Sequence, residues 1–277
     1  MLAVLLLLAA LALSYFAANP EPRRLADGVV RYELSGPTHG RVMVLVHGGG
    51  LATLDAWTPL MRFLNRRILR YDLFGQGHSD RPRGTYNLDL FDRQLDHLLA
   101  RLGISEPVDL VGHSMGGLIA ATYAARRPER INSLTLLAPA GIETGLHWTV
   151  KLVQIPIVGE YLFRMFGRQM AASQYRQHGL KCLEFKGSRR ALLSALRNIP
   201  WNGADAFARV GGRQFPVLAL FGGRDRTVPL SAAAQLARWI PHAEIHQLER
   251  ATHGLLEDHA SVIGELLDAM MSWEEAA

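Results

Sequence analysis

The chain has 277 residues, of which 49% are hydrophobic and 20% charged, a globular composition that excludes intrinsic disorder and collagen-like repeats. A chain of this length can bury a core without a metal or disulfide, and its single cysteine, Cys182, excludes an intrachain disulfide framework and a cysteine-rich zinc site. Lysine and arginine outnumber aspartate and glutamate by 30 to 25, so the net charge of +5 leaves contact with an anionic surface open.

An uncharged apolar segment begins the chain. Residues 1–20 carry no charged side chain, and residues 2–18 are almost continuously apolar, close to the lower length limit for a membrane-spanning helix. We favour a retained membrane anchor because no Lys or Arg precedes the apolar run and Phe16 interrupts the small residues that a cleavage site needs. The alternative is a cleaved signal, which predicts a secreted or periplasmic protein. Arg23 and Arg24 follow the run and leave its orientation open.

After residue 22, short apolar runs alternate with longer helical patterns, and no internal repeat occurs. The apolar runs predict strands at residues 29–34, 42–46, 68–71, 108–111, 133–137, 217–221 and 244–247. The helical patterns cover residues 88–102, 115–126, 231–239 and 260–271. This alternation predicts an α/β fold with a mostly parallel sheet covered on both faces, in which sites form at the carboxyl ends of the strands.

The strongest local signal is a serine between glycines at a strand exit. The residues Gly112-His113-Ser114-Met115-Gly116 follow one predicted strand and begin a predicted helix. Such a sequence forms a strained turn that lifts the serine hydroxyl above the sheet, and the next backbone amide points to where an oxyanion would form. We therefore predict Ser114 as a nucleophile and Met115 as an oxyanion donor. The alternative is an ordinary turn whose serine caps the helix.

A serine hydroxyl needs a base to take its proton and an acid to orient that base. In sheets of this kind the acid and then the base follow the serine along the chain. Asp225 directly follows a predicted strand, and His253 occupies a short, glycine-bounded loop after the last strand. We predict Asp225 as the acid and His253 as the base, with Glu143 as the alternative acid. Asp258, just past His253, is interpreted as a helix-start residue.

The second oxyanion donor should follow an earlier strand. His47-Gly48-Gly49-Gly50 comes directly after the predicted strand at residues 42–46, and glycine lets a backbone approach a substrate oxygen closely. We predict the amide of Gly49 as the donor, with Gly50 next, and interpret His47 as a structural residue that holds the loop.

Several blocks now occur in a recognisable order. They are His47–Gly50, Asp72-Leu73-Phe74-Gly75-Gln76-Gly77-His78-Ser79-Asp80-Arg81-Pro82, Gly112–Gly117, Gly223-Arg224-Asp225 and His253-Gly254. Together they resemble the α/β-hydrolase superfamily from about Val29 onward. Within it, the chain is similar to monoacylglycerol lipases, lysophospholipases and carboxylesterases, and to hydrolases of aromatic ring-fission products.

The resemblance implies an α/β-hydrolase fold: a mostly parallel central sheet, helices on both faces and a helical cap inserted after strand 6. It also implies a Ser-Asp-His triad and hydrolysis without a cofactor or metal. A serine at position 114 argues against haloalkane dehalogenases and epoxide hydrolases, because those families need a carboxylate there.

Three parts follow from this organisation: an anchor or signal at residues 1–20, a hydrolase core at residues 21–140 and 214–277, and a cap at residues 141–213. Residues 141–215 contain eleven basic and only four acidic residues, together with many large apolar residues. One hypothesis is that the cap lies against anionic lipid headgroups and admits an acyl chain from the bilayer. The alternative is that its apolar residues pack onto the core and its basic residues are merely solvated.

These features predict a serine hydrolase that cleaves carboxylic esters through an acyl-enzyme, with apolar or lipid-like acyl substrates. The expected partners are a small-molecule or lipid ester and a membrane, and no nucleic acid. Two alternatives remain open: a carbon–carbon bond hydrolase of ring-fission dienoates, and a non-catalytic binding protein with a hydrolase-like fold.

Overall fold

The computed structural model describes residues 28–142, 148–165 and 183–275. Its centre is a seven-stranded sheet with the strand order β1-β3-β2-β4-β5-β6-β7. The strands are β1 (Tyr32–Ser35), β2 (Val42–Val46), β3 (Arg67–Tyr71), β4 (Val108–His113), β5 (Ile131–Leu137), β6 (Val217–Gly222) and β7 (Glu244–Leu248). β1 pairs antiparallel with β3, and every other pairing in this sheet is parallel. The mostly parallel sheet that the sequence predicts is therefore confirmed.

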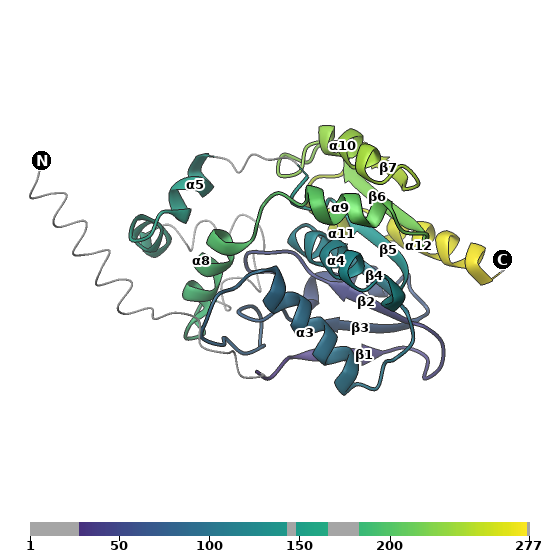
Figure 1. The fold of residues 1–277 in the computed structure, drawn as a ribbon, viewed down its shortest axis with the longest axis horizontal. Helices are drawn as coiled ribbons and strands as arrows, with labels where there is room; N and C mark the ends of the chain where they lie inside the picture. Colours follow the sequence, from purple (N-terminus) through teal and green to yellow (C-terminus); the bar gives the residue numbers. More distant parts are fainter. Residues whose placement is uncertain (1–27, 143–147, 166–182, 276–277) are drawn as a thin grey trace, which may run out of the picture.

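Helices cover both faces of the sheet (Figure 1). The helices are α2 (Thr58–Met61), α3 (Leu88–Arg101), α4 (Met115–Arg126), α5 (Trp148–Gln154), α8 (Ser188–Asn198), α9 (Ala204–Gly211), α10 (Ser231–Trp239), α11 (Leu255–Asp258) and α12 (Ala260–Glu275), with short 3-10 turns η1 (Leu54–Trp57) and η2 (Pro128–Arg130). α3, α4, α9 and α10 contact one another in series, and α2, α11 and α12 form a separate group. A mostly parallel sheet with helices on both faces agrees with the fold that the resemblance implies.

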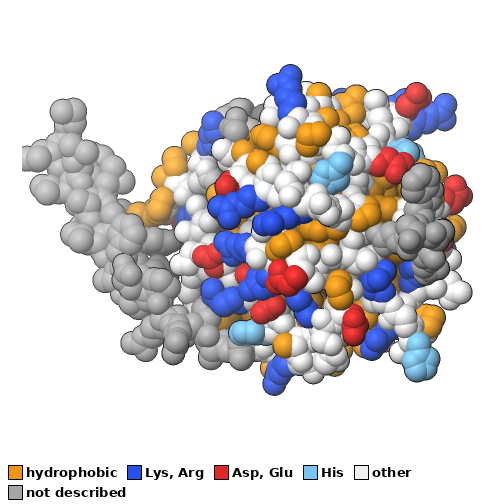
Figure 2. Space-filling model, turned by 45° about the vertical axis from the view of Figure 1, so that its right-hand side comes forward, with side chains coloured by type: hydrophobic (Ala, Val, Ile, Leu, Met, Phe, Trp, Pro, Cys, Tyr) orange, Lys and Arg blue, Asp and Glu red, His pale blue; other side chains and the backbone are white. Residues whose placement is uncertain are grey.

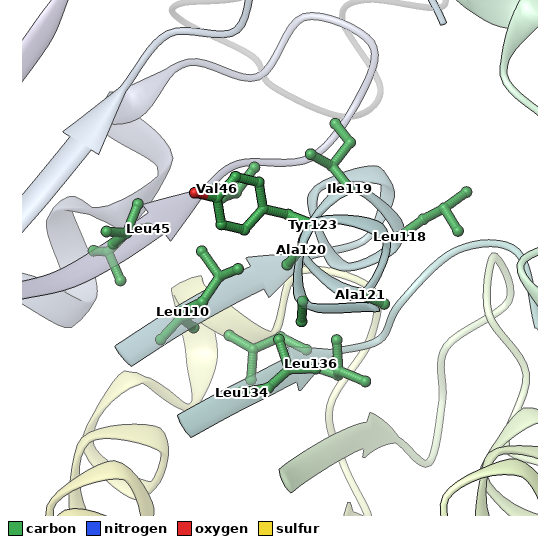
Figure 3. Close-up of a cluster of buried hydrophobic side chains, with 14 of the residues drawn as sticks. Leu45, Val46, Leu110, Leu118, Ile119, Ala120, Ala121, Tyr123, Leu134 and Leu136 are labelled. Atoms are coloured by element: carbon green, nitrogen blue, oxygen red, sulfur yellow. The ribbon is translucent and has the colours of Figure 1, made fainter. Parts of the chain in front are cut away.

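The core lies where α4 packs on the central strands. Figure 3 shows side chains of α4 against apolar residues of the neighbouring strands β2, β4 and β5. The α4 residues are Leu118, Ile119, Ala120, Ala121 and Tyr123, and the strand residues include Leu45, Val46, Leu110, Leu134 and Leu136. All ten are buried, because a parallel sheet with helices on both faces removes both sides of its inner strands from water. This packing fixes the start of α4 relative to the strand ends.

Two of the predicted elements differ from the structure by three or more residues at one end. The first strand begins at Tyr32 rather than at residue 29, because the preceding backbone pairs with a loop instead of a strand. The amide of Val29 donates to Asp80 Oδ2 at 2.8 Å, and the amide of Arg31 donates to Ser79 Oγ at 2.9 Å. The last helix continues to Glu275 rather than to residue 271, since residues 272–275 contain no glycine or proline to end it.

The insertion follows β5, the fifth described strand in chain order, whereas the resemblance places it after strand 6. α5 and α8 contact each other within it. α9 contacts α4 and α10 instead, and Phe207 of α9 stacks on Trp239 of α10 with ring centroids 5.8 Å apart. The division into a core and a cap at residues 141–213 remains a prediction.

The N-terminal apolar segment at residues 1–20 lies outside the described ranges. Within residues 28–142, 148–165 and 183–275, every helix is too short or too polar to cross a bilayer.

We predict that Gly116→Ala destabilises the fold strongly. A Cβ at position 116 would lie 2.1 Å from the backbone oxygen of Val46, so the start of α4 would have to move away from β2. Overpacking of this kind costs about 1–3 kcal/mol or more. Urea unfolding followed by circular dichroism measures the loss. Gly212→Ala is the matched control, because its Cβ would meet nothing closer than 3.6 Å. Equal midpoints for both variants would contradict the prediction.

Candidate active site

Ser114 occupies the sharp turn between β4 and α4. Its backbone angles are φ 54° and ψ −120°, a strained combination for a residue with a side chain. The turn is held by backbone hydrogen bonds: the Ser114 amide donates to Leu137 at 2.9 Å, and the Ser114 carbonyl accepts from Gly117 and Ala140 at 2.9 Å each. A Cβ on Gly112 would lie 2.3 Å from the Gly116 oxygen, so this turn is possible only with glycine at that position.

The structure brings the three predicted side chains together. His253 Nε2 lies 2.9 Å from Ser114 Oγ, and His253 Nδ1 lies 2.7 Å from Asp225 Oδ2. Asp225 lies in the loop after β6, and His253 lies in the loop between β7 and α11. The Asp225 side chain is fully buried and that of His253 is 18% exposed. The serine hydroxyl, imidazole and carboxylate therefore form one continuous hydrogen-bonded chain.

Asp225 is held as a carboxylate by three hydrogen bonds. Its Oδ1 accepts hydrogen bonds from the amides of Thr227 at 2.7 Å and Val228 at 2.9 Å, while Oδ2 faces His253. Burial alone would raise the pKa of Asp225, but the hydrogen bond and charge of His253 and the two amides outweigh burial and hold that pKa below its ordinary value. A carboxylate can only accept, so His253 Nδ1 carries its proton and Nε2 is left to accept from Ser114.

The glycine loop after β2 lies over this serine. A Cβ on Gly48 would lie 3.3 Å from Ser114 Cβ, and one on Gly49 would lie 3.0 Å from Met115 Sδ. The loop therefore contacts the nucleophile turn directly. Met115 is the first residue of α4, and the first amides of a helix have no acceptor within the helix. Gly49 and the Met115 amide thus lie beside the serine, where the sequence predicts an oxyanion site.

His47 holds the glycine loop in place. Its Nδ1 donates to the Gly48 carbonyl at 2.8 Å, and its Nε2 accepts from the Leu73 amide at 3.0 Å. The ring is fully buried, and burial lowers the pKa of His47 despite the opposing charge of Asp72. His47 is therefore a neutral ring that joins the loop after β2 to the loop after β3, which agrees with the structural interpretation.

The block at residues 72–82 forms hydrogen bonds that hold the loops after β2 and β3. Asp72 is buried; its Oδ1 accepts from the Leu54 amide at 2.7 Å and its Oδ2 from the His78 amide at 2.8 Å. The Asp72 carbonyl accepts from Ser79 Oγ at 2.6 Å and from Gln94 Nε2 at 3.0 Å. These hydrogen bonds give partners to backbone amides and a carbonyl that would otherwise be buried without one.

Residues 41–186 match the family model for the alpha/beta hydrolase fold. The chain belongs to the α/β-hydrolase family. Two curated relatives match almost the whole hydrolase. The 2-hydroxymuconate semialdehyde hydrolase of Pseudomonas putida is 28% identical, over 93% of this chain and 97% of the relative. The cis-3-alkyl-4-alkyloxetan-2-one decarboxylase of Xanthomonas campestris is 26% identical, over 92% of this chain and 97% of the relative.

Solved structures show the same fold. Haloalkane dehalogenase DbeA from Bradyrhizobium elkani superposes with a TM-score of 0.79 at 24% identity, and the match covers 93% of this α/β-hydrolase and 99% of that chain. Names as different as hydrolase, decarboxylase and dehalogenase show that the fold alone does not set the reaction. The chemistry of this hydrolase must therefore be argued from its own site.

Two other acidic residues were candidates from the sequence. Asp258 lies in the first turn of α11, as the sequence predicts. Glu143, the alternative acid, lies outside the described residues. Among the described residues, no group of three or more His, Cys, Asp or Glu side chains is arranged to hold a metal ion.

His113 is a part of the site that sequence reasoning did not find. Its Nε2 donates to the backbone carbonyl of His253 at 3.0 Å, and the two rings lie 5.0 Å apart. His113 is buried. Its place directly before the nucleophile was visible in the sequence, but its bond to a loop 140 residues away was not. Burial, reinforced by the neighbouring His253, lowers the pKa of His113 to about 3.

We predict that His113 makes stability fall in weak acid. The unfolded chain takes up this proton near pH 6.5, whereas the folded protein resists it until about pH 3. Between these values the unfolded state binds one more proton, so the free energy of unfolding falls by about 1.4 kcal/mol for each pH unit lowered. Above pH 7 this dependence disappears.

Urea unfolding of the wild type and His113→Gln at pH 4.5, 5.5 and 6.5 measures the effect. Glutamine keeps a donor for the His253 carbonyl but does not titrate. The variant should lose about 1.4 kcal/mol per pH unit of slope relative to the wild type. Parallel slopes would mean that the His113 ring is already protonated in the folded protein.

Proposed function

We propose that this α/β-hydrolase cleaves carboxylic esters through a covalent acyl-enzyme, with Ser114 as nucleophile, His253 as general base and Asp225 as its orienting acid. The observation that carries this proposal is the chain of hydrogen bonds from Ser114 Oγ to His253 at 2.9 Å and from His253 to Asp225 at 2.7 Å. A serine hydroxyl is a weak nucleophile alone, and this arrangement supplies the base that it needs.

In the proposed reaction, Ser114 Oγ attacks the ester carbonyl carbon while His253 Nε2 takes the hydroxyl proton. Asp225 stabilises the resulting imidazolium and holds its Nδ1–H. The tetrahedral intermediate collapses when its carbon–oxygen bond to the alcohol breaks, and His253 gives its proton to the departing alcohol. A water molecule then attacks the acyl-enzyme with the same base, and the acid leaves with Ser114 restored.

The amides of Met115 and Gly49 are the proposed donors to the oxyanion. Their support is the position of the glycine loop against the first residue of α4, next to Ser114. Donors fixed by packing need no reorganisation when the negative charge develops, and losing one such donor costs about 10² to 10³ in rate.

The apolar surroundings favour an apolar acyl group. Leu51 directly follows the glycine loop. It packs in a small hydrophobic cluster with Val153, Phe163, Leu192 and Leu193, separate from the main core. A hydrophobic cluster that includes the residue after the glycine loop suits an alkyl chain better than a charged acyl group.

A second candidate is hydrolysis of a carbon–carbon bond in a ring-fission dienoate. It is favoured by the likeness, over nearly the whole chain, to a relative named 2-hydroxymuconate semialdehyde hydrolase. The same three side chains would serve either reaction, so only turnover of the two substrate classes separates them. A non-catalytic binding protein is the remaining alternative from the sequence.

We also propose that residues 1–20 anchor the protein to a membrane, with a secreted or periplasmic protein after cleavage as the alternative. The support is the uncharged apolar sequence of that segment. Mass determination of the N-terminus of the protein isolated from cells separates the two, because cleavage removes the apolar run.

We predict that Ser114→Ala abolishes ester hydrolysis and labelling by a fluorophosphonate probe. Removal of the hydroxyl leaves no atom to form the acyl-enzyme, so only weak residual catalysis from binding and the oxyanion donors should remain. Wild type and variant are compared on a panel of monoacylglycerols, lysophospholipids, p-nitrophenyl esters and a ring-fission dienoate. Turnover of the dienoate alone would favour the second candidate, and an unlabelled, inactive wild type would favour the binding protein.

Asp225→Asn should reduce kcat by about 10³ to 10⁴ while leaving the fold intact. The amide has nearly the same shape as the carboxylate, but it cannot stabilise a protonated His253 and can reverse which ring nitrogen carries the hydrogen. Steady-state kinetics on a p-nitrophenyl ester measure the change. Asp258→Asn is the matched control and should retain wild-type kcat. A similar loss from Glu143→Gln, with Asp225→Asn active, would assign the acid to Glu143.

A further inference from the structure

Exposed apolar side chains gather on a helical hairpin at residues 151–165. It consists of the end of α5, a turn, and a further helical segment at residues 158–165. Among the described residues eleven large hydrophobic side chains are exposed, and six of them belong to this hairpin. They are Leu152, Ile155, Ile157, Val158, Tyr161 and Met165. More than half of the exposed large apolar side chains thus gather on 15 residues.

This exposed set is distinct from the residues that hold the hairpin to the protein. Val153 and Phe163 face inward and pack on Leu192 and Leu193 of α8 and on Leu51 of the glycine loop. The outer side chains take no part in this cluster: Tyr161 is 64% exposed and Met165 is 56% exposed. The hairpin is therefore apolar on two faces, and only the inner face is covered.

The turn of the hairpin is fixed by specific bonds. Ile157 has φ 70°, a conformation that β-branched residues rarely adopt. Its amide donates to Glu160 Oε2 at 2.7 Å. Arg197 of α8 binds both carboxylate oxygens of Glu160, at 2.8 and 2.9 Å, and donates from Nε to the Gln154 carbonyl at 2.9 Å. These contacts hold the apolar turn outward, so its exposure does not come from a loose loop.

The free charges beside this surface are positive. Lys151 and Arg164 are exposed on the hairpin, whereas the acidic Glu160 is paired with Arg197. Figure 2 shows hydrophobic and basic side chains together at the left edge of the described surface, on the side where α5 lies in Figure 1. An apolar surface next to basic residues suits a bilayer with anionic headgroups better than a neutral apolar partner.

The first described residues lie near the elements that hold the hairpin. The amide of Val29 donates a hydrogen bond to the side chain of Asp80. Arg81, which follows Asp80, donates to the hydroxyl of Ser188 at 3.0 Å, and Ser188 is the first residue of α8. α8 contacts α5, and the described chain begins below α8 in Figure 1. Residues 19–28 can span at most about 35 Å, so a membrane-bound apolar run keeps this end of the protein near the bilayer.

We propose that the outer face of the hairpin at residues 151–165 docks on the surface of an anionic lipid bilayer. Its six exposed apolar side chains enter the headgroup region, and Lys151 and Arg164 meet lipid phosphates. The opposite, inner face of the hairpin packs on Leu51, which adjoins the glycine loop. If the proposed ester hydrolysis holds, docking brings this part of the protein to the lipid that supplies the ester, so this inference deepens the proposed function.

The test places an environment-sensitive fluorophore on the hairpin of the full chain. Cys182→Ser removes the native thiol, and Tyr161→Cys or, as matched control, Val262→Cys on α12 receives a nitrobenzoxadiazole label. Each protein is mixed with vesicles of phosphatidylglycerol and phosphatidylcholine, or of phosphatidylcholine alone. We expect a blue shift, and quenching by spin-labelled lipid, at position 161 with anionic vesicles, a weaker effect with neutral vesicles, and none at position 262. This readout does not depend on catalysis.

Three outcomes overturn the proposal. A label at position 161 that stays in water while the protein is vesicle-bound shows that the N-terminal segment acts alone. Shielding without vesicles that grows with protein concentration identifies a second copy of the chain as the occupant. Shielding without vesicles at every concentration identifies the chain's own apolar segment.

A second measurement uses exposed positions that leave the fold intact. The double variant Ile155→Ser, Tyr161→Ser should hydrolyse a vesicle-embedded monoacylglycerol several-fold more slowly, with unchanged turnover of a soluble p-nitrophenyl ester. Equal rates on the vesicle substrate overturn the docking role. If neither the wild type nor the variant hydrolyses either substrate, the proposed function is wrong, whereas the conclusion from the fluorophore is unaffected.

Discussion

The structure depends on one close approach, between the start of α4 and the ends of β2 and β4. Gly112 and Gly116 leave no room for a Cβ there, since added atoms would lie 2.3 and 2.1 Å from backbone oxygens. In the same turn the Ser114 backbone has φ 54°, and its hydroxyl lies 2.9 Å from His253 Nε2. The same contact presses the glycine loop against Met115. The nucleophile, the helix start and the loop are thus consequences of a single steric constraint.

Electrostatics then separate the roles of three histidines that lie near one another. His47 and His113 are fully enclosed and are held neutral by burial, and each bonds a backbone carbonyl that fixes a loop. Of the three, His253 is the one whose hydrogen bonds include a carboxylate, Asp225, and its side chain is partly exposed. That environment suits the proposed role of His253 as a base, which requires an imidazolium to be stabilised.

Much of the fold and site could be predicted because strong local rules agree with the global fold. The helices at 115–126 and 231–239 have the predicted ends, and the positions of Ser114, Asp225 and His253 follow from strand exits in chain order. The cap helices could not be predicted in the same way. Residues 151–165 are apolar toward both α8 and water, so their sequence lacks the single apolar stripe that identifies a surface helix. The bond from His113 to the His253 loop joins two distant segments, and no sequence spacing encodes it.

The fold of this hydrolase is shared by proteins that are named for different reactions. Relatives with different reaction names share the fold, because the sheet and its helices only deliver loops to one edge. In this chain those loops present a serine where a dehalogenase-like reaction would need a carboxylate, as the family resemblance implies. The shared fold therefore leaves the reaction to the side chains that these loops present.

Leu51 gives the insertion a direct link to that chemistry. It follows the glycine loop by one residue and shares a cluster with Val153 and Phe163. Lifting the hairpin would strip this leucine of its neighbours and expose it to water, at a cost of up to about 2 kcal/mol. The position of the hairpin and the order of the residue that follows the glycine loop are therefore thermodynamically coupled, and the coupling is reciprocal.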